Sequence, residues 1–306
     1  MMLTIKRDTV VYAMSPENPP VARVHSGDAL IFETMDCFSG QIACAEDKLG
    51  TLDWSRINPA TGPVYVEGAA PGDTLKVEIM RIDLAPQAAI VEMPGSGVTG
   101  LAAQEENVKI LPVKDGVVTL GEQIELPVKA MIGVIGTAPA EGAIATGTPD
   151  LHGGNMDCKR IGAGATLYLP VNVPGALLAM GDLHAVMGDG EVCVCGAEIA
   201  GEITVRVTVV KRQQCQPGSG LPLPFLVTKD AAMAIYSAPG LDAAAEGTTL
   251  RMRSFLIDAV GMQPHEAGML LSLAADLRIC QAVDPNKTCR MELPLSILEK
   301  MGYRFP

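Results

Sequence analysis

Two glycine-rich stretches, DLHGGNMD (150–157) and GDLHAVMGDGE (181–191), concentrate side chains that can bind a metal ion or move a proton. They hold two of the chain's four histidines, His152 and His184. They also hold five acids: Asp150, Asp157, Asp182, Asp189 and Glu191. If residues 182–184 are extended, Asp182 and His184 point to the same face of a strand. An imidazole and carboxylates that converge in this way suit a divalent cation such as Zn²⁺. Either stretch alone is more typical of turns, but the presence of both favours a shared site.

The segment MDCFSG (35–40) is a weaker candidate. Asp36 follows an apolar run, where an acid is often a turn residue. Cys37 could serve as a thiol nucleophile with His184 as its base, although a buried, unreactive cysteine is the more typical case. GSGVTG (95–100) matches the dinucleotide fingerprint, but no alternating series of strands and helices surrounds it, so a dinucleotide site is not expected.

The charge and hydropathy of the chain argue against several classes of function. The 23 Lys and Arg residues against 35 Asp and Glu give a net charge of −12, and no Lys/Arg-rich run occurs. We therefore expect no nucleic-acid partner and no membrane partner. The N-terminus lacks the apolar core of a signal peptide, and no apolar stretch is long enough to span a bilayer. Eight cysteines without a C-x-x-C pair fit reduced, buried thiols, so we expect a soluble cytoplasmic protein.

The elements that must position these residues are mainly strands. Residues 30–36 and 203–209 alternate between two faces, and residues 75–84 alternate until the phase slips at Met80 and Arg81, which predicts a β-bulge. Helical spacing and end signals gather near the C-terminus, in 252–261, 264–277 and 295–302, with a strand predicted over 277–283.

These patterns predict an α+β, predominantly β fold, with sandwich- or barrel-like sheets and a few C-terminal helices. We expect a β-rich N-terminal part, 1–140, and a β-rich part, 141–306, that carries the candidate site and the C-terminal helices. No linker separates the two parts, so they are expected to interlock as one compact unit.

Long segments of the chain resemble the acetamidase/formamidase family of amide hydrolases. The resemblance covers nearly the whole chain, and its blocks are DCFSGQI (36–42), NPATGPVYVEGAAPGDTLKVEI (58–79), HGGNMD (152–157), LYLPVNVPGALLAMGDLHAVMGDGEV (167–192) and DPNKTCRMELP (284–294). It implies hydrolysis of small linear amides to a carboxylate and ammonia, a β-rich fold, a bound metal and a homo-oligomer.

The resemblance also implies which side chains form the site. Its acidic and histidine positions fall on Asp36, His152, Asp157, His184, Glu191 and Glu198, and Asn155 and Gln41 lie inside the matched blocks. We expect a divalent metal, with Zn²⁺ first and Ca²⁺ or another ion as alternatives. His184 and Asp157, helped by His152 and Asp36, would hold the metal. The bound metal would activate a water molecule as the nucleophile.

Proton transfer and substrate binding need further groups. Glu191 or Glu198 would accept the proton of water and pass it to the departing amine. Asn155, or the backbone N–H groups of Gly153 and Gly154, would stabilise the oxyanion, and Gln41 would contact the substrate. Because Glu191 and Glu198 are opposite in phase along an extended strand, they are not expected to share one site without a bulge.

Three alternatives remain open from the sequence. A cysteine-dependent amidase would use Cys37, whereas a non-catalytic protein would only bind small amides. In a purely structural β protein, the His/Asp clusters would be turns.

Overall fold

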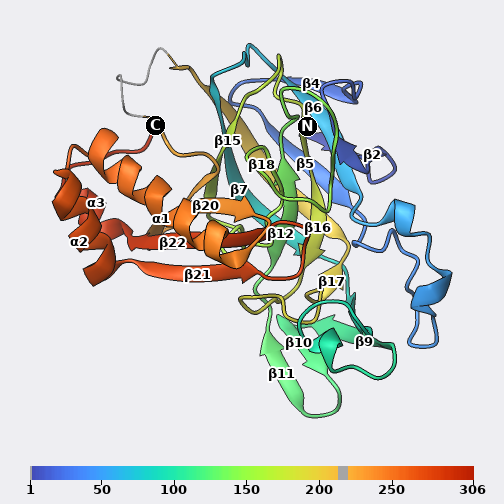
Figure 1. Ribbon diagram of the computed structural model, residues 1–306. Helices are drawn as coiled ribbons and strands as arrows, with labels where there is room; N and C mark the ends of the chain where they lie inside the picture. Colours follow the sequence, from blue (N-terminus) through green and yellow to red (C-terminus); the bar gives the residue numbers. More distant parts are fainter. Residues whose placement is uncertain (1, 213–219) are drawn as a thin grey trace.

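The computed structural model describes residues 2–212 and 220–306, and most of its elements belong to two large sheets (Figure 1). One sheet has nine strands in the order β1 (Leu3–Ile5), β5 (Ala29–Thr34), β18 (Gly201–Val210), β7 (Thr74–Leu84), β15 (Thr166–Pro170), β19 (Phe225–Val227), β20 (Ala231–Ala238), β22 (Lys287–Pro294) and β21 (Asp276–Gln281).

The other large sheet carries most of the candidate site. It runs β11 (Ile124–Pro127), β10 (Val117–Leu120), β9 (Asn107–Lys114), β8 (Gln87–Glu92), β17 (Glu198–Ile199), β16 (Leu178–His184), β12 (Met131–Gly136) and β14 (Gly153–Asn155). β6 (Ala60–Glu67) also pairs with β16 and carries β2 (Val10–Val11) and β4 (Ala22–His25), while β3 (Ala13–Met14) and β13 (Ile144–Ala145) form a small separate sheet. The strands β9, β10 and β11 project from the rest (Figure 1).

The predicted alternation of the long strands is confirmed. In β5, Leu30, Phe32 and Thr34 are buried while the residues between them are partly exposed. In β7, Arg81 pairs with Thr204 and Ile79 pairs with Val205, so Met80 has no partner across β18. The bulge expected from the phase slip is therefore present. An extra residue of this kind shifts the side chains beyond it to the other face of the strand.

The core lies between the two large sheets. Phe32 and Val205 come from one sheet, Ile132 and Leu183 come from the other, and all four are fully buried in one apolar cluster. β16 and β12 are buried along their whole length, which is typical of strands covered on both faces. A polar side chain on either strand is thus held in the interior. The ranges 1–140 and 141–306 both contribute strands to each sheet.

Three helices cover the end of the nine-stranded sheet formed by β20, β22 and β21 (Figure 1). They are α1 (Leu241–Asp258), α2 (Pro264–Ala274) and α3 (Leu295–Lys300). Two predicted helix-end signals are confirmed: Gly261 follows α1 with φ of 85°, and Pro264 is the first residue of α2. Phe255 of α1 packs on Phe225 with ring centroids 5.0 Å apart. The predominantly β, α+β fold expected from the sequence is confirmed.

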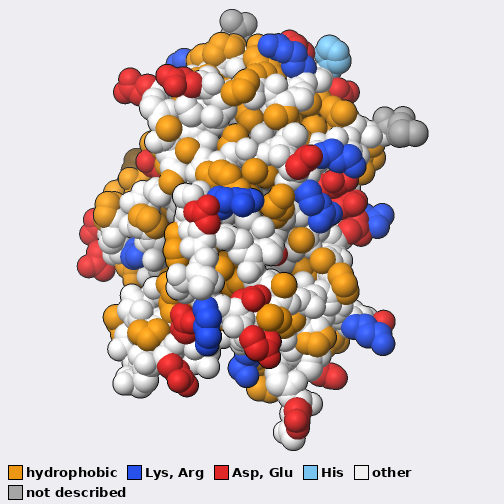
Figure 2. All heavy atoms as spheres, turned by 90° about the vertical axis from the view of Figure 1, so that its right-hand side faces the viewer, with side chains coloured by type: hydrophobic (Ala, Val, Ile, Leu, Met, Phe, Trp, Pro, Cys, Tyr) orange, Lys and Arg blue, Asp and Glu red, His pale blue; other side chains and the backbone are white. Residues whose placement is uncertain are grey.

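The surface shows no field of one charge on the face seen in Figure 2, where acidic, basic and apolar side chains are interspersed. In the parts of the chain that the structure describes, no helix combines the length and the apolar character needed to cross a bilayer. The seven cysteines described are all free thiols, and Cys215 lies outside the described residues.

An aspartate-based turn opens β5 and another opens β7. Asp28 accepts the backbone N–H of His25 at 2.8 Å, and Asp73 accepts that of Ala70 at 3.0 Å. Asp73 also accepts the Lys211 ammonium at 2.7 Å. Burial alone would raise the pKa of Asp73, but Lys211 and the backbone N–H groups outweigh it and lower that pKa.

We expect Asp73→Asn to reduce the free energy of unfolding at pH 7 by about 1 kcal/mol, because a charge-assisted hydrogen bond is lost. Since the folded-state pKa is depressed, this stabilisation is present above the unfolded-state pKa of about 4 and is lost as the pH falls through the folded-state value. Urea titrations from pH 7 to pH 3 should show the two proteins converging. Asp28→Asn is the matched control, with a smaller effect; a difference that persisted unchanged at pH 3 would contradict the assignment.

Candidate active site

Three parts of the chain, around residue 157, over 182–198 and around residue 284, bring polar side chains to one place beside β16. Asp182 and His184 lie on β16 itself, and Glu198 opens β17 directly opposite His184 in the strand register. Asp157 follows β14, which pairs with β12. Glu191 comes from the turn after β16, and Asp284 comes from the turn between β21 and β22.

His184 is the centre of this cluster. Its Nδ1 lies 3.3 Å from the Met187 sulfur, so Nε2 is the nitrogen that faces the acids. The distances from Nε2 to the carboxylate oxygens are 3.0 Å for Glu198, 3.5 Å for Asp182, 3.8 Å for Asp157 and 3.9 Å for Glu191. One imidazole therefore faces four carboxylates, and all five side chains are buried.

The backbone is strained where it delivers these acids. Asp157, Asp182 and Glu191 have φ of 43°, 56° and 47°, in the left-handed region that non-glycine residues seldom occupy. Strain of this kind persists only where the surrounding structure enforces it, and it gathers at functional sites. Gly133 of β12 leaves the necessary room, since a Cβ there would lie 2.5 Å from an oxygen of Asp157 and 2.5 Å from one of Asp182.

Burial dominates the electrostatics of the cluster. It raises the pKa of Asp157 and of Glu191 well above the usual range, and neighbouring carboxylates add to the effect. It raises the pKa of Glu198 to about 7, although His184 opposes the shift. Burial alone would lower the pKa of His184, but the carboxylates of Glu198 and Asp182 outweigh it and raise that pKa. Burial thus favours the protonated, uncharged form of these acids unless a cation balances their charge.

The donor set fits a divalent cation. Ligand atoms of Asp157, His184 and Glu191 all lie within 4.8 Å of one another, as do those of a second group, Cys37, Asp182 and Glu198. Several carboxylate oxygens are buried without a hydrogen-bond partner among the described residues: both of Asp157, Oδ1 of Asp182, Oε2 of Glu191 and Oε2 of Glu198. Buried acids without partners are costly unless they are protonated or bound to a cation.

Two of the expected metal ligands lie outside both of these groups. Asp36 follows β5, and its Oδ1 accepts the backbone N–H of Gly40 at 3.0 Å, which is the turn role weighed for it above. His152 is buried, and neither ring nitrogen has a hydrogen-bond partner within residues 2–212 and 220–306. Burial lowers its pKa to about 4, so its ring is neutral. The pair His184 and Asp157 does come together as expected.

Of the residues expected to bind substrate, Asn155 lies at the cavity and Gln41 does not. Asn155 lines the cavity beside the cluster, and its Nδ2 donates to Asp284 at 3.0 Å. Gln41 instead exchanges hydrogen bonds with the backbone of Asp53, at 2.8 and 3.3 Å, and does not line the cavity. Gly153 and Gly154 are close-packing positions, since a Cβ would meet Ile135 O at 2.3 Å or Thr148 O at 2.5 Å.

The expectation that Glu191 and Glu198 would not share a site is wrong. Both carboxylates approach His184 Nε2, at 3.9 and 3.0 Å. The strand assumed between them does not form, because Glu191 and Val194 have φ of 47° and 77° and no strand begins until Glu198. The ligands and proton carriers expected from the sequence do not include Asp182 or Asp284, although both acids line the cavity. Asp182 had a signal, its shared face with His184, whereas Asp284 is an isolated acid in a hairpin turn.

A cavity of about 130 Å³ opens beside the cluster. One side is polar, formed by Asn155, Asp182, Glu191, Glu198 and Asp284. The other side is largely apolar, formed by Cys37, Phe38, Ile57, Val91, Met93 and neighbours, and it includes the half-exposed Trp54. A small molecule with one polar and one apolar end matches this lining.

Comparison with known proteins places the chain in a family. The family model described as the Acetamidase/Formamidase family matches residues 6–146 and 127–300. An acetamidase from Bacillus halodurans is 46% identical, with a TM-score of 0.95 over 98% of this chain and 100% of that one. An acetamidase from Yersinia enterocolitica is 31% identical, with a TM-score of 0.91 over 97% of this chain and 93% of that one.

A more distant relative is the formamidase of Methylophilus methylotrophus, 28% identical over 256 residues. That match covers 64% of this chain and 63% of the formamidase, so it spans less than two thirds of the relative's length. The family model, in contrast, extends over nearly all of the present sequence, including every acid of the cluster. The chain belongs to the acetamidase/formamidase family.

Proposed function

We propose that this chain hydrolyses small linear amides, such as formamide or acetamide, to a carboxylate and ammonia. The observation that carries the proposal is the cluster of four buried carboxylates around His184, which faces a cavity of about 130 Å³ with an apolar opposite wall. The relatives named acetamidase and formamidase support it.

The cluster would hold a divalent cation through His184, Asp157 and Glu191, whose ligand atoms already lie within 4.8 Å of one another. An imidazole nitrogen beside carboxylate oxygens favours Zn²⁺ over Ca²⁺, which takes oxygen ligands. When bound, such an ion supplies Lewis acidity and lowers the pKa of water from about 15.7 to about 7. We propose Glu191 as a ligand in place of Asp36 and His152, because neither of those belongs to the group.

Glu198 is the residue best suited to move protons. The Gly196 N–H fixes its Oε1 at 2.8 Å, whereas its Oε2 is buried and has no partner in the described chain. Burial brings its pKa to about 7, near the pH at which proton transfer in both directions is efficient. Glu198 would accept the proton of the attacking water and deliver it to the departing nitrogen.

Asn155 and the apolar wall would orient the amide. One N–H of the Asn155 side chain is used by Asp284, which leaves the second for the carbonyl oxygen as it gains charge. The acyl group would rest on Phe38, Ile57 and Val91.

The cysteine alternative is disfavoured by the surroundings of Cys37. Burial raises the pKa of its thiol well above the usual range, and the carboxylates of Glu198, Asp182 and Asp36 raise it further. A thiolate, the nucleophilic form, is therefore suppressed.

We expect Cys37→Ala to keep kcat/KM for formamide within about tenfold of the parent chain, because a side chain that only packs contributes through shape. A chelator should instead abolish ammonia release, and added Zn²⁺ should restore it. The measurement is ammonia release from formamide, acetamide and propionamide, with elemental analysis before and after chelation. Loss of activity in Cys37→Ala that chelation does not reproduce would favour the thiol, and binding of amides without ammonia release would indicate a non-catalytic protein.

The oligomeric state and the cellular location of the chain are also part of the proposal. We propose a homo-oligomer that works in the cytoplasm, on the resemblance to the family and on the free thiols of the seven described cysteines. Light scattering coupled to gel filtration gives the subunit number directly.

A further inference from the structure

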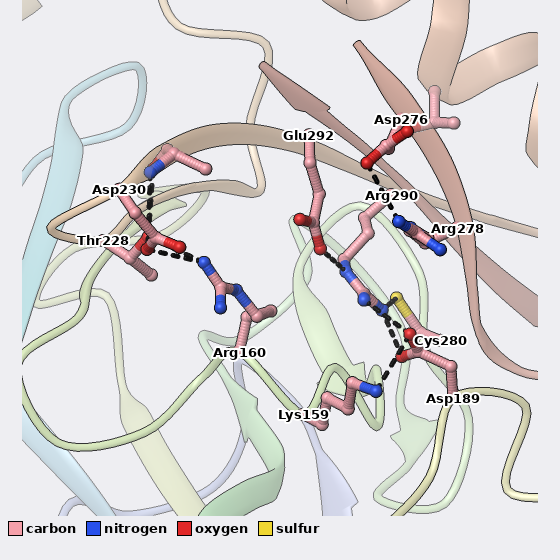
Figure 3. A network of polar contacts seen from close by, with 12 residues as sticks. Lys159, Arg160, Asp189, Thr228, Asp230, Asp276, Arg278, Cys280, Arg290 and Glu292 are labelled. Atoms are coloured by element: carbon pink, nitrogen blue, oxygen red, sulfur yellow. Dashed lines mark hydrogen bonds and ion pairs between the residues drawn. The ribbon is translucent and has the colours of Figure 1, made fainter. Parts of the chain in front are cut away.

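Arg290 of β22 is a buried cation that the proposed chemistry does not use. Its side chain is 2% exposed. Nη1 and Nη2 donate to Oδ1 and Oδ2 of Asp189 at 2.7 and 2.9 Å, and Nε donates to Glu292 at 2.5 Å (Figure 3). A two-point contact between a guanidinium and a carboxylate fixes both distance and orientation. Arg290 therefore determines where Asp189 lies.

Asp189 belongs to the turn that carries Glu191 into the cavity. The same turn is joined to β21 by two backbone hydrogen bonds, from Gly190 N to Cys280 O at 2.9 Å and from Ala282 N to Gly190 O at 3.0 Å. Gly190 and Glu191 have φ of 98° and 47°, so this segment has no regular structure of its own. Its conformation depends on what holds it from outside.

The hairpin of β21 and β22 also delivers Asp284 to the cavity. Gln281 Oε1 accepts the backbone N–H groups of Val283 and Asp284 at 2.9 and 3.0 Å, and Gln281 Nε2 donates to Thr288 Oγ1 at 3.1 Å. The hairpin turn is thus fixed internally. Arg290 is the side chain that joins this rigid hairpin to the turn before Glu191.

We propose that Arg290, acting through Asp189, is the positioning residue for Glu191, and that it sets the affinity of the acidic cluster for its divalent cation. The inference rests on the proposed function for its link to turnover, but the cation affinity can be measured without it. Lys159 also contacts Asp189, at 3.0 Å, but its side chain is 35% exposed and it offers a single point of contact. It is the weaker of the two partners.

Arg278 provides a matched control. It lies directly across from Arg290 in the register of β21 and β22, and it forms an ion pair with Asp276 at 2.9 Å (Figure 3). Those two side chains are 50% and 66% exposed, and they lie at the surface. Replacing Arg278 removes one positive charge from the same hairpin without touching the turn that precedes Glu191.

The test is a Zn²⁺ titration of the full chain by calorimetry, together with formamide kinetics. Arg290→Met should weaken Zn²⁺ binding and lower kcat/KM by roughly 10–100-fold, the usual loss when a residue that orients a ligand is removed. Asp189→Asn should reproduce this loss, and the double variant should be no worse than Arg290→Met. Arg290→Lys should recover part of it, whereas Arg278→Met should match the parent chain.

Two results would overturn the inference. One is Zn²⁺ affinity and kcat/KM unchanged in Arg290→Met; the other is a loss in Arg290→Met that Asp189→Asn does not share. If Arg290→Met does not fold, Asp189→Asn carries the test, because Asp189 is 28% exposed and tolerates replacement better. If the parent chain releases no ammonia but Arg290→Met and Asp189→Asn still weaken Zn²⁺ binding, the proposed function fails and this inference stands.

Discussion

Replacing His184 by glutamine should lower kcat/KM for small amides by on the order of 10³-fold or more and should abolish stoichiometric Zn²⁺ binding. His184 Nε2 faces the carboxylates of Glu198, Asp182, Asp157 and Glu191, at 3.0 to 3.9 Å. Glutamine has a similar reach but is a poor ligand for Zn²⁺. The readouts are ammonia release and the metal content of the purified variant.

His152→Gln is the matched control for this experiment. His152 is also a buried histidine, but it belongs to neither group of converging ligand atoms. We expect His152→Gln to retain its metal and to lose less than about tenfold in kcat/KM, as expected for a change in packing beside a site. If His152→Gln lost as much metal as His184→Gln, the ligand set expected from the sequence would be right and the one proposed here would be wrong.

The sequence predicts the strands and helices of this fold better than it predicts the contacts between distant elements. The alternation in β5 and the bulge at Met80 are local patterns, and both appear in the structure. The pairing of His184 with Glu198 depends instead on backbone turns at Glu191 and Val194, whose positive φ no side-chain pattern encodes. Local periodicity reports which face a residue occupies, not which distant strand lies against it.

The same limit explains which site residues were found. His184 and Asp157 stand in glycine-rich stretches, where close approach of backbones is expected, and they do meet. Asp284 joins them from a hairpin turn in the last part of the chain. It opens one of the blocks that resemble the family, but no histidine or glycine stands near it to mark it as a site residue. Asp36, expected as a ligand, uses one oxygen to close its own turn with Gly40.

Gly133→Ala should damage the site strongly although it leaves every acid and histidine in place. A Cβ at Gly133 would lie 2.5 Å from Asp157 Oδ1, 2.5 Å from Asp182 Oδ2 and 3.0 Å from the Asp182 carbonyl oxygen. Because both acids have strained backbones inside buried segments, they cannot withdraw without moving the cluster. Overpacking of this kind costs about 1–3 kcal/mol in the free energy of unfolding.

The effect on turnover should exceed the effect on stability. A displacement of about 1 Å at a catalytic group can cost about 10²-fold in rate, and Gly133→Ala displaces two acids together. We therefore expect kcat/KM to fall by at least about 100-fold at a temperature where the variant is still folded. Gly188→Ala is the control, since a Cβ there meets nothing within 4 Å although Glu191 is three residues away. Equal activity in Gly133→Ala and Gly188→Ala, with both folded, would mean that the carboxylates of Asp157 and Asp182 need not lie where the structure places them.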